Sequence, residues 1–240
     1  MKTNKSIILL GLITLTAFSC KEASPEPEPT SLKVGLVAHI PLDGNADDIS
    51  ETGLIGTITG ATVTKDRKGK AGGAFYFDGT NDFILYNQTD KLNFSGAKPY
   101  TLSAWVKPDA LRESGSSLAI SKFDGGVAAS WYLGVTKDAN IVSYRNVAPW
   151  SAAGLSTITV EKYVHLLATY DGTDLKLYVN GVLDGSKPFT TNPNDAKTPV
   201  MIGGSHSRGT PTPNFTGSVD EVRIYNRVLE ASEIEWLAKN

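Results

Sequence analysis

Short apolar segments separated by Gly, Pro, Asn and Asp recur along the chain from residue 36 onward. Residues 101–106 and 174–180 alternate apolar and polar side chains with a period of two, the pattern of a β-strand with one buried face. Asn180 and Gly181 end the second of these segments and indicate a two-residue hairpin turn, since both tolerate a positive φ. Further segments predicted to be strands are residues 36–42, 74–77, 83–86, 118–123, 131–135, 164–170, 200–202 and 219–225.

One segment near the end of the chain has a different spacing. Residues 230–238 place Ile234, Leu237 and Ala238 on one side of a helix. We expect this helix to pack on a sheet edge. Many short strands joined by turns are typical of a β-sandwich or barrel, so residues 36–240 are predicted to form one all-β domain with a short C-terminal helix.

The start of the chain has a targeting pattern. Two lysines precede an uncharged, mostly apolar run at residues 6–18. That run is too short to span the ~30 Å hydrocarbon core as a helix, so residues 1–19 are predicted to be a signal peptide. Ser19 then precedes Cys20, which resembles the lipobox of bacterial lipoproteins and implies acylation of Cys20. The alternative is ordinary secretion with an incidental free cysteine.

Residues 20–35 contain alternating Pro and Glu. This composition cannot bury a core and favours an extended spacer. We expect a tether that holds the domain away from a membrane in which acyl chains on Cys20 are buried. The acidic stretch also resembles surface-export signals of some Gram-negative lipoproteins, with a plain tether as the alternative. The expected location is the bacterial outer membrane or cell surface.

Charge and cysteine content exclude several functions. The 240-residue chain has a formal net charge of −2, which argues against a broad basic surface for nucleic acid. A single cysteine excludes an internal disulfide and any multi-cysteine metal site. The three histidines are widely separated, which argues against a His-rich metal centre.

Several motifs together resemble one family. They are Leu-Val-Ala-His-Ile-Pro-Leu-Asp-Gly-Asn-Ala at 36–46, Asp-Gly-Thr-Asn-Asp at 78–82, Ser-Ala-Trp-Val at 103–106, Thr-Tyr-Asp-Gly at 169–172, Tyr-Val-Asn-Gly at 178–181 and Val-Asp-Glu-Val-Arg-Ile-Tyr-Asn-Arg at 219–227. In order and spacing they resemble LamG-like jelly-roll domains of the concanavalin A-like lectin/glucanase superfamily. The resemblance implies an antiparallel two-sheet jelly-roll sandwich. It leaves the function open, because this fold hosts lectins, glycan hydrolases and adhesive modules.

The residues of an enzyme are missing from the sequence. Glucanases of this superfamily place two carboxylates close together in a Glu-x-Asp-x-x-Glu motif, which this chain lacks. Asp220 and Glu221 are the nearest acidic pair, but adjacent residues of a strand are expected to point to opposite faces. No nucleophile elbow or phosphate loop occurs either. We therefore expect no catalysis, and a polysaccharide-cleaving enzyme is the less favoured alternative.

A metal site is suggested by one carboxylate. The alternation predicts that Asp220 shares a face with Val222 and Ile224, where an unpaired charge is costly. The resemblance implies a structural calcium ion with Asp220, Asp43 and the Gly79 carbonyl among its ligands. Calcium takes 6 to 8 oxygens, so other carbonyls and water would complete the shell. A hydrogen bond to backbone amides or a pair with an arginine is the alternative for Asp220.

A glycan surface needs exposed aromatic rings beside polar groups. Trp150 is the leading candidate, because it lies in a loop-like stretch after Tyr144 and Arg145. His206 and Arg208, from a Gly/Ser-rich loop, are candidate donors. The alternative is that Trp150 only caps a sheet edge.

Other aromatic and histidine side chains are assigned to structure. Trp105 and Trp131 lie in predicted strands and are expected in the core, and Trp236 is expected to pack inward from the helix. His39 and His165 also lie in predicted strands and are expected to be structural.

The sequence thus predicts a non-catalytic, lectin-like surface lipoprotein that binds a polysaccharide or other glycan. An adhesive or scaffolding module that binds protein partners in an outer-membrane complex is the alternative.

Overall fold

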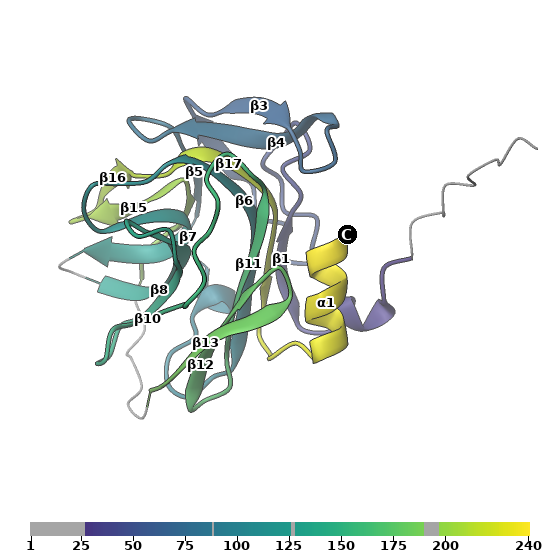
Figure 1. Cartoon of the computed structure of the whole chain (residues 1–240), viewed down its shortest axis with the longest axis vertical. Coiled ribbons are helices and arrows are strands. Elements are labelled where there is room, and N and C mark those ends of the chain that lie inside the picture. The colour runs from purple at the N-terminus through teal and green to yellow at the C-terminus, as the bar shows by residue number, and fades with distance from the viewer. Residues whose placement is uncertain (1–26, 88, 126–127, 190–196) are drawn as a thin grey trace, which may run out of the picture.

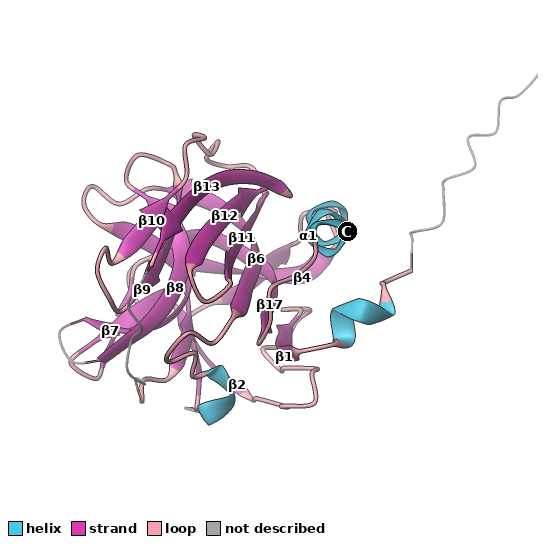
Figure 2. Cartoon of the chain, turned by 90° about the horizontal axis from the view of Figure 1, so that it is seen from below, coloured by secondary structure: helices cyan, strands magenta, loops and turns pink. Residues whose placement is uncertain are grey.

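The structure is a computed structural model that describes residues 27–87, 89–125, 128–189 and 197–240, without the side chains of 128 and 129. Two sheets stack face to face as a sandwich, and one helix lies outside it (Figure 1; Figure 2). The predicted all-β jelly-roll sandwich with a short C-terminal helix is confirmed. The predicted signal peptide and Cys20 lie outside the described residues. No helix in the described ranges has the length and apolar character needed to cross a lipid bilayer.

The first sheet has eight strands in the order β13-β12-β11-β6-β17-β4-β3, with β1 paired to β17. Every pairing in it is antiparallel. The Asn180-Gly181 turn joins β12 to β13, as the sequence predicts. Its strands are β1 (Leu36–Ile40), β3 (Thr62–Lys65), β4 (Ala71–Asp78), β6 (Tyr100–Ala110), β11 (Val164–Tyr170), β12 (Asp174–Val179), β13 (Val182–Pro188) and β17 (Thr216–Tyr225).

The second sheet has nine strands in the order β10-β9-β8-β7-β14-β5-β2, with β15 paired to β7 and β16 to β15. Its pairings are antiparallel except for the short parallel contact of β15 with β7. Its strands are β2 (Gly56–Thr59), β5 (Phe83–Tyr86), β7 (Ser116–Gly125), β8 (Ala128–Thr136), β9 (Ile141–Arg145), β10 (Ser151–Ala153), β14 (Val200–Ile202), β15 (Gly204–Ser207) and β16 (Thr210–Pro213).

The main core lies between the sheets. Period-two alternation sends every second side chain of a strand inward, so Leu102 and Val106 of β6 meet Trp131 and Leu133 of β8 in one apolar cluster. Trp131 is buried, as expected from the sequence. Each large buried side chain contributes about 1.5–3 kcal/mol to the free energy of folding. This packing fixes the positions of the strands and therefore of the side chains on the outer face of each sheet.

A second, smaller apolar cluster lies outside the eight-stranded sheet. There α1 (Ala231–Lys239) and the 3-10 helix η1 (Thr30–Lys33) pack on β11 and β17, and Leu32 is fully buried. The packed part of the chain thus begins before residue 36, where the sequence analysis placed the domain boundary. Arg227 donates to both carboxylate oxygens of Glu233 at 2.7 and 2.8 Å, which fixes the start of α1. A further 3-10 helix, η2, covers Asp90–Leu92.

Strand β17 carries a β-bulge that the sequence analysis missed. Its register with β6 shifts between Asp220 and Arg223, and Glu221 has a φ of 49°. The extra residue interrupts the alternation. Val222 and Ile224 stay in the core, whereas Asp220 and Glu221 both pair with charged groups on the outer side of the sheet. Two predictions are therefore corrected: Asp220 does not share a face with Val222, and the acidic pair does not point to opposite faces.

Candidate functional site

Four aromatic side chains stand side by side on the outer face of the nine-stranded sheet. This aromatic row consists of Phe123 on β7, Tyr132 on β8, Tyr144 on β9 and Trp150 beside β10. The Tyr132 and Tyr144 rings are stacked, with centroids 5.1 Å apart and planes at 15°. Phe123 meets both edge-on, at 5.5 and 5.0 Å. The row spans four neighbouring strands.

Trp150 ends the row and is its most exposed member. Its ring stacks on Tyr144, with centroids 6.4 Å apart and planes at 20°, and 54% of the residue is exposed. Both polar backbone groups of Trp150 are hydrogen-bonded. Its N–H donates to the Val147 carbonyl at 2.7 Å, and its carbonyl accepts from the Arg145 N–H at 2.9 Å. Trp150 has a φ of 70°, which is rare for a bulky residue. Such strain persists at sites where the surroundings fix it, and functional sites are enriched among them.

Tyr144 adds a polar group beside this indole. Its hydroxyl donates to the side-chain oxygen of Asn146 at 3.1 Å. Burial raises the pKa of Tyr144 to about 12, so the phenol stays neutral at ordinary pH. The row therefore offers aromatic surface with an uncharged hydrogen-bonding edge.

Arg145 does not belong to this surface. It follows Tyr144 in β9 and points to the opposite face, into the core, where it is 1% exposed. Its guanidinium lies 3.4 Å from the Tyr170 ring centroid and donates to the Gly96 carbonyl at 3.0 Å. The prediction that Arg145 contacts a ligand is corrected by this burial.

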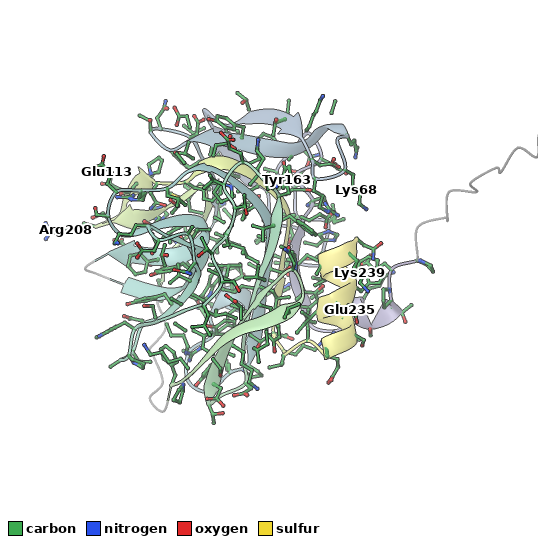
Figure 3. The ribbon with its side chains drawn as sticks, in the orientation of Figure 1. Lys68, Glu113, Tyr163, Arg208, Glu235 and Lys239 are labelled. Carbon is green, nitrogen blue, oxygen red and sulfur yellow. The ribbon has the colours of Figure 1, made fainter. Side chains whose placement is uncertain are left out.

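His206 and Arg208 lie on the far side of β7 from Trp150. His206 is on β15 and is buried, paired in register with Asp124 of β7. Arg208 is in the following turn, whose Arg208 and Gly209 amides donate to the Asp124 carboxylate. Figure 3 shows the Arg208 side chain at the edge of the molecule away from α1. In the order of the sheet, four strand steps separate this turn from Trp150.

The residues expected to bind calcium do not come together. Asp43 pairs with Lys70 at 2.7 Å, and Asp220, 2% exposed, pairs with Arg67 at 2.5 Å. Lys70 precedes the eight-residue strand β4 and Gly79 follows it, so the whole strand, about 25 Å long at ~3.3 Å per residue, lies between them. No three His, Cys, Asp or Glu side chains of the described ranges are grouped to hold a metal ion. These three residues do not fit one calcium ion, and the arginine alternative holds for Asp220.

The outer face of the eight-stranded sheet carries a polar layer beneath α1. His165 of β11 is 1% exposed, and its Nε2 lies 2.8 Å from the Ser103 hydroxyl of β6. Trp105 was expected in the core, but it lies in this layer and donates its indole N–H to the Leu237 carbonyl at 3.1 Å. Glu221 accepts from Arg223 at 3.3 Å and lies 3.0 Å from the His39 ring. These histidines are structural in placement, as the sequence analysis assumed.

The buried His165 gives the protein an acid sensitivity. Burial, helped by the charges of Arg67 and Arg223, lowers the pKa of His165 to about 3. In the unfolded chain a histidine titrates near 6.5, so between pH 6.5 and 3 the unfolded state binds more protons and stability falls as pH falls. From pH 7 to pH 5 we expect this residue to remove about 2 kcal/mol of unfolding free energy. Urea unfolding at both pH values measures it.

The control for this expectation is His165→Gln, which removes the titrating group. The contribution of His165 is the difference between the two proteins in the change of unfolding free energy from pH 7 to pH 5, and it should be about 2 kcal/mol. Burial raises the pKa of Asp220 to about 7, so this carboxyl takes up a proton in the same window and opposes the loss of stability, but it does so in both proteins. An equal pH dependence in both proteins would show that His165 is not the group responsible.

Two members of the aromatic row, Tyr132 and Phe123, were missed by the sequence analysis. The signal for Tyr132 was present: Trp131 was assigned to the core, so its strand neighbour points outward. Phe123 had no such signal, because β7 shifts register between Lys122 and Phe123.

Two stacked β-sheets, antiparallel in all but one short pairing, define a jelly-roll sandwich domain. The chain belongs to the concanavalin A-like lectin/glucanases superfamily, whose family model matches residues 78–235. The resemblance seen in the sequence motifs is thereby confirmed.

Solved structures of other proteins share the fold. Domain 4 of the extracellular GH43 arabinanase AbnA from Geobacillus stearothermophilus, solved with arabinotriose, is 25% identical with a TM-score of 0.65, covering 85% of this chain and 98% of that domain. The binding domain of Paraclostridial mosquitocidal protein 1 is 21% identical with a TM-score of 0.70, covering 86% of this chain and 52% of that one. A third structure is from botulinum neurotoxin type C, a toxin whose cell entry is dependent upon interaction with two ganglioside molecules. It is 12% identical with a TM-score of 0.65, covering 88% of this chain and 52% of that one.

The chain spans about half the length of these two toxin fragments. A search of curated proteins gave no match.

Proposed function

We propose that this protein is a non-catalytic carbohydrate-binding module whose contact surface is centred on Trp150. The observation that carries the proposal is the half-exposed indole of Trp150, stacked on Tyr144 and fixed by its backbone hydrogen bonds. Sugar rings have apolar C–H faces and a rim of hydroxyls. An open aromatic face with nearby hydroxyl and amide groups, here Tyr144 and Asn146, matches both.

The geometry of the aromatic row favours sugar binding at its Trp150 end rather than at its middle. Tyr132 and Tyr144 stack on each other, so their faces are occupied and they present edges to solvent. Trp150 is the terminal ring, with one face against Tyr144. The other face is the place for a sugar ring to stack.

The arabinanase domain supports a glycan ligand. It matches this chain over 98% of its own length and was solved with an arabinose oligosaccharide. Membership of a superfamily of lectins and glucanases agrees with that ligand class. Arabinan is therefore the first polysaccharide to try.

The proposal that the module binds a glycan without cleaving it rests on the ion pairs that Asp220 and Glu221 form. Although the bulge brings Asp220 and Glu221 to one side of the sheet, Asp220 pairs with Arg67, and Glu221 pairs with Arg223 and contacts His39. Retaining glycosidases need two carboxyl groups free to act on one bond. Engagement of both groups by basic side chains argues against that role.

We further propose that acylated Cys20 anchors the module at the bacterial outer membrane or cell surface. The lipobox-like sequence and the Pro/Glu-rich stretch support this. Mass spectrometry of the protein extracted from a producing bacterium would show the acyl mass on Cys20. A free thiol on Cys20 would instead support ordinary secretion without a lipid anchor.

Affinity electrophoresis of the full chain tests glycan binding. Native gels containing arabinan, xylan, galactan or laminarin would be run with calcium and with a chelator. We expect slower migration than a non-binding reference protein in at least one gel. Equal mobility in all gels would reject the proposal and favour a module that binds protein partners. Retardation lost with chelator would support the predicted calcium ion, held by ligands other than the predicted set.

A further inference from the structure

Part of the predicted spacer is docked on the outer face of the eight-stranded sheet. Leu32 is fully buried in the apolar cluster beside α1. Arg227 holds the backbone on both sides of it, because its guanidinium donates to the Ser31 carbonyl at 2.8 Å and to the Val34 carbonyl at 2.7 Å. Residues 28–34 therefore form a docked segment that belongs to the folded domain.

An ion pair secures the start of the docked segment. Glu28 pairs with Arg223 of β17, whose side chain is 6% exposed. The Arg223 guanidinium also lies over the Trp236 ring of α1, 6.0 Å from its centroid. Glu28, Trp105 and Trp236 line one cavity of about 240 Å³ between α1 and the sheet. Salt screens a partly buried charge pair only weakly, so Glu28 is held beside these two indoles.

The docked segment and the aromatic row lie on opposite sides of the sandwich. The docked segment packs with α1 outside the eight-stranded sheet, whereas Trp150 stands on the outer face of the nine-stranded sheet. Figure 1 and Figure 2 both place α1 across the molecule from β10, the strand that begins after Trp150. A line from α1 to Trp150 crosses both sheets, with layers about 10 Å apart, so a chain joining the two sides has to go around them.

The length of chain before the docked segment limits the position of Cys20. Eight Cα-to-Cα steps join Cys20 to Glu28. At no more than ~3.6 Å per step, Cys20 lies within about 29 Å of Glu28. If residues 28–34 were free, sixteen steps would lead to the start of β1 at Leu36, and the reach would be about 58 Å. Docking therefore halves the reach of Cys20 and centres it on the α1 side.

We infer that the α1 side of the domain faces the membrane in the anchored protein and that the aromatic row faces away from it. The inference rests on the proposed acylation of Cys20. Acyl chains on Cys20 stay in the bilayer, and the docked segment keeps Cys20 on the α1 side. The lipid surface therefore lies against that side and leaves Trp150 open to a glycan.

A nitroxide spin label on Cys20, the single cysteine of the chain, tests this geometry. The label broadens the nuclear magnetic resonance signals of nearby protons, and its effect falls steeply with distance. The indole N–H signals of the four tryptophans of the full chain are the readout, and Trp236→Phe and Trp150→Ala each identify one of them by its loss. Compared with the chemically reduced label, we expect the Trp236 signal to lose most of its intensity and the Trp150 signal to keep it.

Releasing the docked segment should weaken the effect on Trp236. Glu28→Lys replaces the anion of the ion pair with a cation, and Leu32→Ala, made in the same protein, removes the buried side chain. The matched control is Glu113→Lys, the same charge change at an exposed residue that Figure 3 places away from α1. An unchanged position of the signal of Trp131, which donates to the Leu92 carbonyl in the core, shows that the released variant is folded. If that variant unfolds, the wild-type signals decide alone.

Two results would overturn the inference. The first is an equal loss of intensity at Trp150 and Trp236 in the wild type, and the second is a Trp236 signal that the label leaves intact. Neither measurement needs an acyl chain or a glycan, so the label tests the geometry separately from the proposed function. If mass spectrometry finds no acyl group on Cys20, the proposed anchor fails, and the membrane-facing side fails with it whatever the label shows.

Discussion

Replacing Trp150 with alanine is expected to abolish retention of the protein in the polysaccharide gel that retards the wild type. Exposed aromatic residues that stack on a ligand behave as hot spots worth about 2 kcal/mol or more, which is a loss of about 30-fold in affinity. The change should cost little stability, because the indole is half exposed and contacts Tyr144 on one side. Gel retardation measures the first effect and urea unfolding the second.

Two further variants make this result specific. Trp150→Phe keeps a flat ring and should retain part of the binding. Ile55→Ala removes a side chain that is 76% exposed near β2, at the other end of the same sheet, and should change nothing. Full retention by Trp150→Ala would show that the aromatic row is structural, as in the alternative of a capped sheet edge.

The sequence predicted the fold well because the fold rests on local patterns. Alternation marked β6 and β12, the Asn180-Gly181 turn marked the hairpin of β12 and β13, and the spacing of Ile234 and Leu237 marked α1. These signals need no knowledge of distant residues. Strand β9 was missed because its inward positions include Ser143 and Arg145, so polar side chains hide the alternation.

The candidate sites were predicted less well, because they depend on departures from the regular pattern. Glutamate rarely adopts a positive φ, so nothing local announces the bulge at Glu221 that turns Asp220 outward. Arg67, which pairs with Asp220, is 153 residues away in sequence. The polar layer beneath α1 is a product of such long-range contacts, and only the three-dimensional structure shows it.

Replacing Arg145 with alanine is expected to lower the free energy of unfolding by about 3 kcal/mol. A desolvated cation–π contact contributes about 2 kcal/mol or more, and Arg145 has one with Tyr170 at 3.4 Å. Truncation also leaves a void beside Tyr100, whose ring centroid is 5.4 Å from the guanidinium, and frees the Gly96 carbonyl. Urea unfolding followed by tryptophan fluorescence measures the loss.

Arg208→Ala is the matched control, since the sequence analysis assigned both arginines to the ligand surface. Arg208 is exposed in its turn, so its removal should change stability by less than about 0.5 kcal/mol. The difference in stability between the two variants distinguishes an arginine packed in the core from one on the surface. If Arg145→Ala kept its stability and lost glycan retention, the side chain would have to reach the outer face, and the register of β9 with β8 would be incorrect. If it loses stability and the folded fraction keeps glycan retention, Arg145 supports the aromatic row from beneath by holding β9 in the core, while Tyr144 and Trp150 make the contact.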